Sequence, residues 1–152
     1  MANNYMSAIT QGVYVIGAEG ENGGKNLMTA AWVTQVSSRP NQVLAAVSAG
    51  HYTAVLLEEN PFFTLSVLGE GQEEVAKVCG FKSGRNTDKT KLTACSYKWR
   101  ELPEVEGAAA VLYCEVKKII KEGDHVLFIG EVLSGEAGDK KPLIYDAKYY
   151  FG

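Results

Sequence analysis

The chain has 152 residues, of which 46% are hydrophobic and 22% charged, so it can form one folded domain and is not a disordered chain. Its 15 Lys and Arg residues and 18 Asp and Glu residues give a net charge of -3, which argues against nucleic acid as a partner. The longest apolar run, Ala108 to Cys114, is far shorter than the roughly 18 residues of a membrane-spanning helix, and the first ten residues lack the pattern of a secretory signal. We therefore expect a soluble, cytoplasmic protein of one domain over residues 1–152, without a membrane partner.

The cysteines and histidines do not form a metal-binding pattern. Cys79, Cys95 and Cys114 include no Cys-x-x-Cys pair, and their odd number predicts reduced thiols whose roles stay open. His51 and His125 are the only histidines, so a metal site would need both of them and carboxylates brought together by the fold. We expect no metal.

The first part of the chain is predicted to form strands joined by tight turns. Residues 12–17 predict a first strand, and the glycine-rich stretch 19–24 predicts a reversal into a second strand over residues 25–37. A third strand is predicted over residues 42–48, after a turn that contains Pro40, because proline is tolerated in a turn but not inside a paired strand.

Two short helices and a fourth strand follow. Residues 51–60 predict a helix, and residues 62–68 are typical of a strand. Residues 71–78 place apolar and acidic side chains at helical spacing, and Gly80 is expected at the C-terminal end of this second helix. The polar, basic stretch 81–92 is expected to be a surface loop.

The clearest hairpin lies in the last third of the chain. Residues 108–120 and 125–133 predict two strands, and the Gly123-Asp124 pair between them is typical of a tight turn. With six or seven strands and two short helices, the chain is expected to form one mainly β, barrel-like domain.

Common catalytic and nucleotide-binding motifs are missing. Gly69-Glu70-Gly71 begins like a dinucleotide fingerprint, but Glu74 stands where the third glycine would be, and no lysine follows a phosphate-binding loop. Neither Ser66 nor Ser134 lies in a Gly-x-Ser-x-Gly turn, so hydrolysis has little support.

Three stretches carry small residues, hydroxyls and basic groups: residues 26–32, 47–53 and 82–89. Small residues let backbone donors approach a flat ring system, and hydroxyls and lysines suit a phosphate. The alternative is that residues 29–31 are ordinary strand residues and that residues 82–89 are a solvated loop.

Five stretches, taken together and in order, resemble the flavin reductase-like family of FMN-binding split barrels, which includes flavoredoxins and the reductase components of two-component monooxygenases. These stretches are Asn26-x-x-Thr29-Ala30-Ala31-Trp32, Val36-Ser37-Ser38-Arg39-Pro40, Cys79-Gly80-Phe81-Lys82-Ser83-Gly84-Arg85 with Asp88-Lys89, Gly123-Asp124-His125, and Pro142-Leu143-Ile144-Tyr145. The resemblance implies a Greek-key-like split β-barrel with FMN as the cofactor.

The resemblance also implies a set of cofactor-binding residues. Residues along the ring and ribityl chain would be Asn26, Met28, Thr29, Ala30, Ala31 and Trp32, with backbone amides facing the ring edge. Val47, Ser48, Tyr52 and Thr53 would line the ribityl-phosphate side, and Ser83, Arg85 and Lys89 would hold the phosphate. Tyr52 could equally bury an apolar helix face, and Trp32 could equally belong to the core.

In similar reductases the residue that matches His125 lies where the nicotinamide docks, which implies that His125 positions the electron donor. The alternative is a histidine bonded to its own turn. The family resemblance implies a homodimeric FMN-binding oxidoreductase. It would accept electrons from NAD(P)H or a redox protein such as rubredoxin and pass them to a flavin or redox-protein acceptor. A non-catalytic electron carrier of the flavoredoxin type, with tightly bound FMN, is the alternative.

Overall fold

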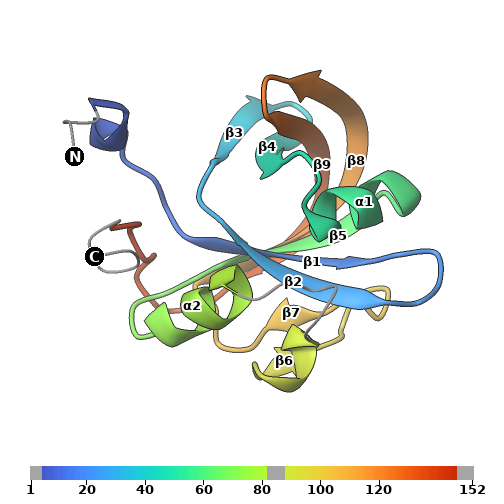
Figure 1. The fold of residues 1–152 in the computed structure, drawn as a ribbon. Helices are drawn as coiled ribbons and strands as arrows, with labels where there is room; N and C mark the ends of the chain where they lie inside the picture. Colours follow the sequence, from blue (N-terminus) through green and yellow to red (C-terminus); the bar gives the residue numbers. More distant parts are fainter. Residues whose placement is uncertain (1–4, 82–87, 147–152) are drawn as a thin grey trace.

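The computed structural model describes residues 5–81 and 88–146 and is mainly β (Figure 1). Its strands are β1 (Tyr14–Glu19), β2 (Lys25–Ala30), β3 (Val33–Ser38), β4 (Asn41–Ser48), β5 (Phe62–Val67), β6 (Cys95–Ser96), β7 (Glu104–Val105), β8 (Ala110–Glu122) and β9 (His125–Ala137). Two α-helices, α1 (Tyr52–Glu59) and α2 (Glu73–Phe81), and two short 3-10 turns, η1 (Tyr5–Ala8) and η2 (Lys89–Lys91), complete the described elements. Neither α-helix is long and apolar enough to cross a membrane.

Seven strands form one antiparallel sheet in the order β2-β1-β5-β8-β9-β4-β3. The sheet curls, so that β3, β4, β8 and β9 rise above β1 and β2 (Figure 1). Its two edge strands, β2 and β3, follow each other in the chain but do not pair with each other, so the barrel is split at this point. The predicted mainly β, split-barrel fold is confirmed.

The predicted second strand, residues 25–37, is wrong in one respect. The chain leaves β2 after Ala30 and joins the opposite edge of the sheet at Val33, with Ala31 and Trp32 between the two strands. The reason lies in long-range pairing, because β2 bonds to β1 whereas β3 bonds to β4. The backbone carbonyl of Trp32 also accepts a hydrogen bond from the amide of Ala46 at 2.9 Å.

The predicted hairpin is confirmed as β8 and β9, with Gly123 at a φ of +59° in its turn. Both strands extend further than predicted, to Glu122 and Ala137, with two register shifts between them.

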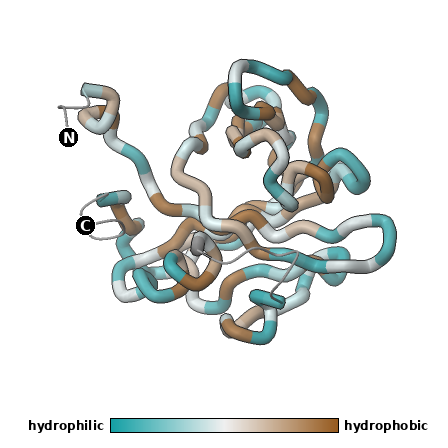
Figure 2. Tube along the Cα trace, viewed as in Figure 1, coloured by the Kyte–Doolittle hydropathy of each residue, from teal (hydrophilic) through white to brown (hydrophobic). Residues whose placement is uncertain are grey.

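Alternating side chains of β2 divide the interior into two clusters. Met28 and Ala30 face the barrel core with residues of α1, β4, β5 and β9, whereas Leu27 faces a second cluster beneath α2. Polar residues concentrate in turns such as the β1–β2 connection, and apolar residues concentrate in the strands (Figure 2). The two sides of β2 therefore offer different surroundings to any cofactor bound along it.

Two predictions near α2 need correction. The helix does not end before Gly80 but continues to Phe81. Gly80 lies against β2, and a Cβ added there would lie 3.4 Å from Cβ of Thr29. The stretch 81–92 is not wholly a solvated loop, because Lys89 is only 1% exposed.

Candidate functional site

A groove with a volume of about 1120 Å³ lies beside the point where the barrel is split. Thr29, Ala31 and Trp32 line it from the β2–β3 side, and Ala76 and Gly80 line it from α2. The remaining wall comes mainly from the N-terminal segment between Met6 and Tyr14. The groove is slightly larger than the roughly 300–1,000 Å³ usual for small-molecule sites. It brings together three of the predicted cofactor-binding residues.

The edge strand β2 presents its backbone beside this groove. Among the described strands β2 pairs only with β1, so its other edge can offer amides and carbonyls to a ligand. The side chain of Thr29 is already engaged, because its Oγ1 donates to the carbonyl of Ala76 at 2.7 Å. Met28 and Ala30 are buried in the barrel core, so only their backbone could meet a cofactor.

Asn26 carries an unused polar group. The residue is 1% exposed, and its Nδ2 donates to Oγ1 of Thr53 at 3.0 Å. Its Oδ1 is the one buried side-chain oxygen or nitrogen without a hydrogen-bond partner in residues 5–81 and 88–146. An unpaired buried acceptor is costly, by about 1–3 kcal/mol. A flavin has N–H and ribityl O–H donors that could pair with it, so this residue fits the cofactor that the sequence predicts.

Four further predicted cofactor-binding residues lie at the end of β4 and at the start of α1, some buried and some exposed. Thr53 is fully buried against Asn26, and its amide donates to Nδ1 of His51 at 3.2 Å, which caps the helix. Ser48 lies exposed at the end of β4. Val47 belongs to the barrel core, and Tyr52 packs against that core as a half-buried side chain. The packing of Tyr52 matches the apolar alternative noted in the sequence.

His125 lies at the start of β9, opposite Ser48 in the strand register. Its Nδ1 lies 2.6 Å from Oδ1 of Asp124, and its ring stacks on the indole of Trp32 with centroids 4.4 Å apart and planes inclined by 29°. The hydrogen bond with His125 lowers the pKa of Asp124. The structure therefore links His125 to the groove through Trp32, and it also shows the bond to its own turn that the alternative foresaw.

The predicted phosphate-binding residues are described only in part. Ser83 and Arg85 lie outside the described residues. The ammonium of Lys89 donates to the carbonyl of Cys79 at 2.8 Å, next to the groove residue Gly80, and burial lowers its pKa. No carboxylate pairs with Lys89 within the described ranges. A buried cation without a counter-charge favours a nearby anion.

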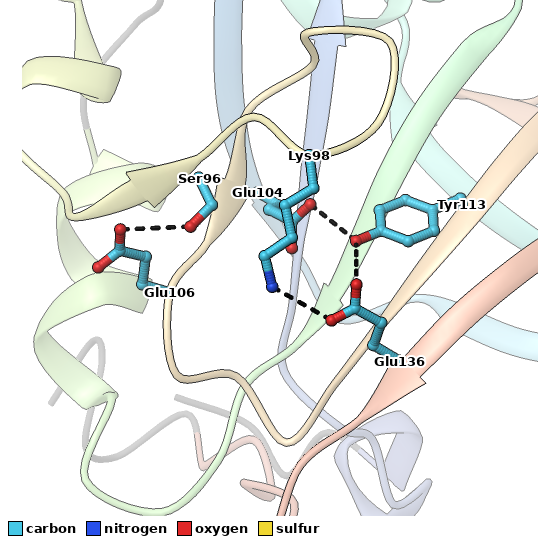
Figure 3. A network of polar contacts seen from close by, with 6 residues as sticks. All are labelled: Ser96, Lys98, Glu104, Glu106, Tyr113 and Glu136. Atoms are coloured by element: carbon cyan, nitrogen blue, oxygen red, sulfur yellow. Dashed lines mark hydrogen bonds and ion pairs between the residues drawn. The ribbon is translucent and has the colours of Figure 1, made fainter.

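A second, smaller cavity of about 280 Å³ lies away from these residues and is acidic. The hydroxyl of Tyr113 lies 2.9 Å from Oε1 of Glu104 and 3.3 Å from Oε2 of Glu136, which pairs with Lys98 at 3.1 Å (Figure 3). Burial and the two carboxylates raise the pKa of Tyr113. Carboxylates repel a phosphate, so this network is unsuited to a flavin nucleotide and instead ties β7 to the β8–β9 hairpin.

Sequence reasoning missed two parts of the site. The N-terminal wall of the groove includes Met6 and Ile9, which are exposed apolar residues within a stretch that the sequence treated only as a missing signal peptide. The alternative of a histidine bonded to its own turn did not name Asp124 as the partner, although its place directly before His125 was a usable signal. The described residues include no cluster of three or more His, Cys, Asp or Glu side chains that could hold a metal.

Comparisons with known proteins point to one family. Residues 6–152 match the model of the flavin reductase like domain. The NADH-dependent flavin reductase StyB of Pseudomonas fluorescens is 33% identical over 144 residues, which cover 93% of this chain and 82% of that protein.

Two solved structures share the fold. The NADH:FAD oxidoreductase SgcE6 of Streptomyces globisporus superposes with a TM-score of 0.84 at 27% identity, covering 91% of this chain and 82% of that one. The FMN-binding protein of Thermus thermophilus superposes with a TM-score of 0.85 at 25% identity, covering 95% and 86%. The chain spans 66% of the length of a further relative from Archaeoglobus fulgidus. With the domain model matched over nearly its whole length, the chain belongs to the flavin reductase-like family.

Proposed function

We propose that this chain is a flavin reductase that takes electrons from NAD(P)H on FMN bound in the groove beside β2 and delivers them to a flavin or redox-protein acceptor. The single observation that carries the proposal is the unpaired, buried Oδ1 of Asn26 on β2, the edge strand from which Thr29 lines the groove. The family membership and the NADH-dependent relatives support the reaction class.

The backbone of β2 and of the β2–β3 connection would hold the ring system. Amides that point from this edge toward a flavin would favour the anionic, reduced ring. Asn26 would accept a hydrogen bond from the cofactor, while Thr53 keeps the other side of its amide in place. Ser48 and Thr53 would lie on the ribityl side in this arrangement.

We assign the phosphate to Ser83, Arg85 and Lys89. Lys89 supports this assignment because its ammonium uses one donor on the carbonyl of Cys79 and is buried without a carboxylate partner in the described part of the chain. A phosphate would supply the missing negative charge. This argument favours FMN, which has a terminal phosphate, over riboflavin, and the FMN-binding relative from T. thermophilus supports it.

His125 would position the donor rather than move a proton. When bound, the flavin supplies hydride acceptance from the nicotinamide, so the protein needs to bring two flat rings together and exclude water. The mainly apolar residues of the groove and the stacked pair of Trp32 and His125 suit that task.

The functional unit would be a homodimer. Exposed apolar side chains gather around the groove, namely Met6, Ile9 and Trp32 in its lining and Tyr5 and Ile144 beside lining residues. η1 stands away from the sheet (Figure 1), as a segment that reaches toward a second copy would. Light scattering coupled to size exclusion would show a mass of twice 16.5 kDa if this is right, and a mass of 16.5 kDa would refute it.

The test is an anaerobic visible spectrum of the purified protein with FMN, followed by NADH. We expect bands near ~450 nm that bleach on addition of NADH, and saturable NADH oxidation when free FMN is supplied. Bands that bleach only with dithionite would instead support the electron carrier. Failure to bind FMN would overturn the proposal, and parallel titrations with FAD and NADPH would define the preferred cofactor and donor.

A further inference from the structure

Trp32 is unusually placed for a tryptophan. Its side chain is 52% exposed and lines the groove, although most large aromatic side chains are buried. The backbone is held by the hydrogen bond from Ala46, and one face of the indole is covered by the ring of His125. An aromatic ring that is anchored on one face and exposed toward a groove can stack a flat ligand on its other face.

Asp124 is hydrogen-bonded to the ring on which Trp32 stacks. A carboxylate is only an acceptor, so Nδ1 of His125 donates to Oδ1 of Asp124 across the 2.6 Å separation. This bond sets the tautomer and limits rotation of the imidazole. The backbone of Asp124 is held in turn, because its carbonyl accepts from the amide of Ala49 at 2.9 Å. The three side chains therefore form a connected series that runs from the hairpin turn to the groove.

We infer that Trp32 is the stacking platform for the nicotinamide ring of the electron donor and that Asp124 is a positioning residue that holds this platform through His125. The inference rests on the proposed function, since it assigns the donor to the side of the groove nearest His125.

Steady-state kinetics separate donor binding from cofactor binding. Replacement of Trp32 by Leu removes the aromatic face, and we expect it to raise the KM for NADH about tenfold, as loss of one aromatic stacking contact predicts. The Kd for FMN should change by a smaller factor, because the flavin contacts proposed for the β2–β3 connection come from its backbone. Trp32→Phe keeps a flat ring and should restore most of the affinity. Trp99→Leu changes the only other tryptophan, which packs on Phe62 and Tyr113, and should leave the KM unchanged.

The choice of nicotinamide over adenine is tested with reduced nicotinamide mononucleotide, which lacks adenine. Trp32→Leu should raise the KM for this donor by the same factor as for NADH. An increase confined to NADH would overturn the assignment, because it would place the adenine on Trp32.

The positioning role of Asp124 needs a spectroscopic readout. In a Trp99→Phe background, Trp32 is the sole tryptophan, and Asp124→Ala should increase acrylamide quenching of its fluorescence and raise the KM for NADH together. Asp124→Asn keeps an acceptor for Nδ1 and should restore both. Unchanged quenching and KM in Asp124→Ala would refute the positioning role, and an unchanged KM in Trp32→Leu would refute the platform. A wild-type protein that neither binds flavin nor oxidises NADH would instead overturn the proposed function.

Discussion

Asn26 on the edge strand donates its side-chain amide to Thr53 in the first turn of α1, and the same bond leaves the Asn26 carbonyl oxygen buried without a partner. The pair joins two segments that sequence alone assigns to opposite ends of a flavin site. The side-chain amide N–H of Asn26 has a partner within the protein, whereas its carbonyl oxygen has none. The first group therefore bears on the stability of the protein and the second on binding of the cofactor.

The double variant Asn26→Leu/Thr53→Val should separate the two. Replacement of both partners by apolar groups of similar shape is nearly neutral for stability, so the Tm of the flavin-free protein should hold or rise. Loss of the acceptor should weaken FMN by about 1–3 kcal/mol, or roughly 5- to 150-fold in Kd. Differential scanning fluorimetry and flavin fluorescence titration measure the two quantities. A double variant that binds FMN as tightly as the wild type would remove Asn26 from the site.

Lys89 offers a test of cofactor choice. We expect Lys89→Met to weaken FMN by about 1.5–3 kcal/mol while riboflavin, which has no phosphate, is affected less than about twofold. Methionine matches the lysine side chain up to Cε, so packing beneath α2 is largely preserved. Equal loss of both ligands would show that Lys89 only secures the C-terminal turn of α2 through the carbonyl of Cys79.

The burial of Lys89 could not be predicted from the local sequence. Its neighbours are polar and predict a solvated loop, yet the side chain is buried because η2 packs against β2 and α2. The break between β2 and β3 at Ala31 and Trp32 could not be predicted from the sequence either. Apolar and β-branched residues continue through it, and only the pairing partners of the two strands differ. The β8–β9 hairpin was predictable because its turn residues and alternation are local. The Trp32–His125 stack joins the β2–β3 connection to the β8–β9 hairpin, and no local pattern reveals such a contact.

The acidic network of Figure 3 should contribute to stability and not to flavin binding. Tyr113→Phe removes the hydroxyl that donates a hydrogen bond to the buried carboxylate of Glu104. Because this carboxylate then lacks its partner, the free energy of unfolding should fall by about 1–3 kcal/mol. Ser96→Ala, a control that removes a hydroxyl from the exposed contact with Glu106, should change it by less than about 0.5 kcal/mol. Urea unfolding gives both values. A Tyr113→Phe variant with normal stability and weakened FMN binding would contradict the structural role.

We expect the buried thiol of Cys114 to make the stability of the protein fall at alkaline pH. The residue is fully buried, and burial raises the pKa of its thiol from 9.0 to about 12. A raised pKa in the folded state means that the unfolded chain loses the proton first, so this contribution to stability is complete below about pH 9 and is lost as the pH rises toward 12.

Cys114→Ala should therefore lose less stability than the wild type between pH 8 and pH 10.5, although it starts lower because a buried sulfur is missing. The difference between the two proteins cancels the titration of the lysines and tyrosines that they share, and urea unfolding at several pH values measures it. The same burial should shield Cys114 from a thiol reagent in the native protein and expose it on unfolding. Equal pH dependence in the two proteins, or rapid native labelling of Cys114, would show that this thiol meets water, which its position opposite Phe63 in the β5–β8 pair argues against.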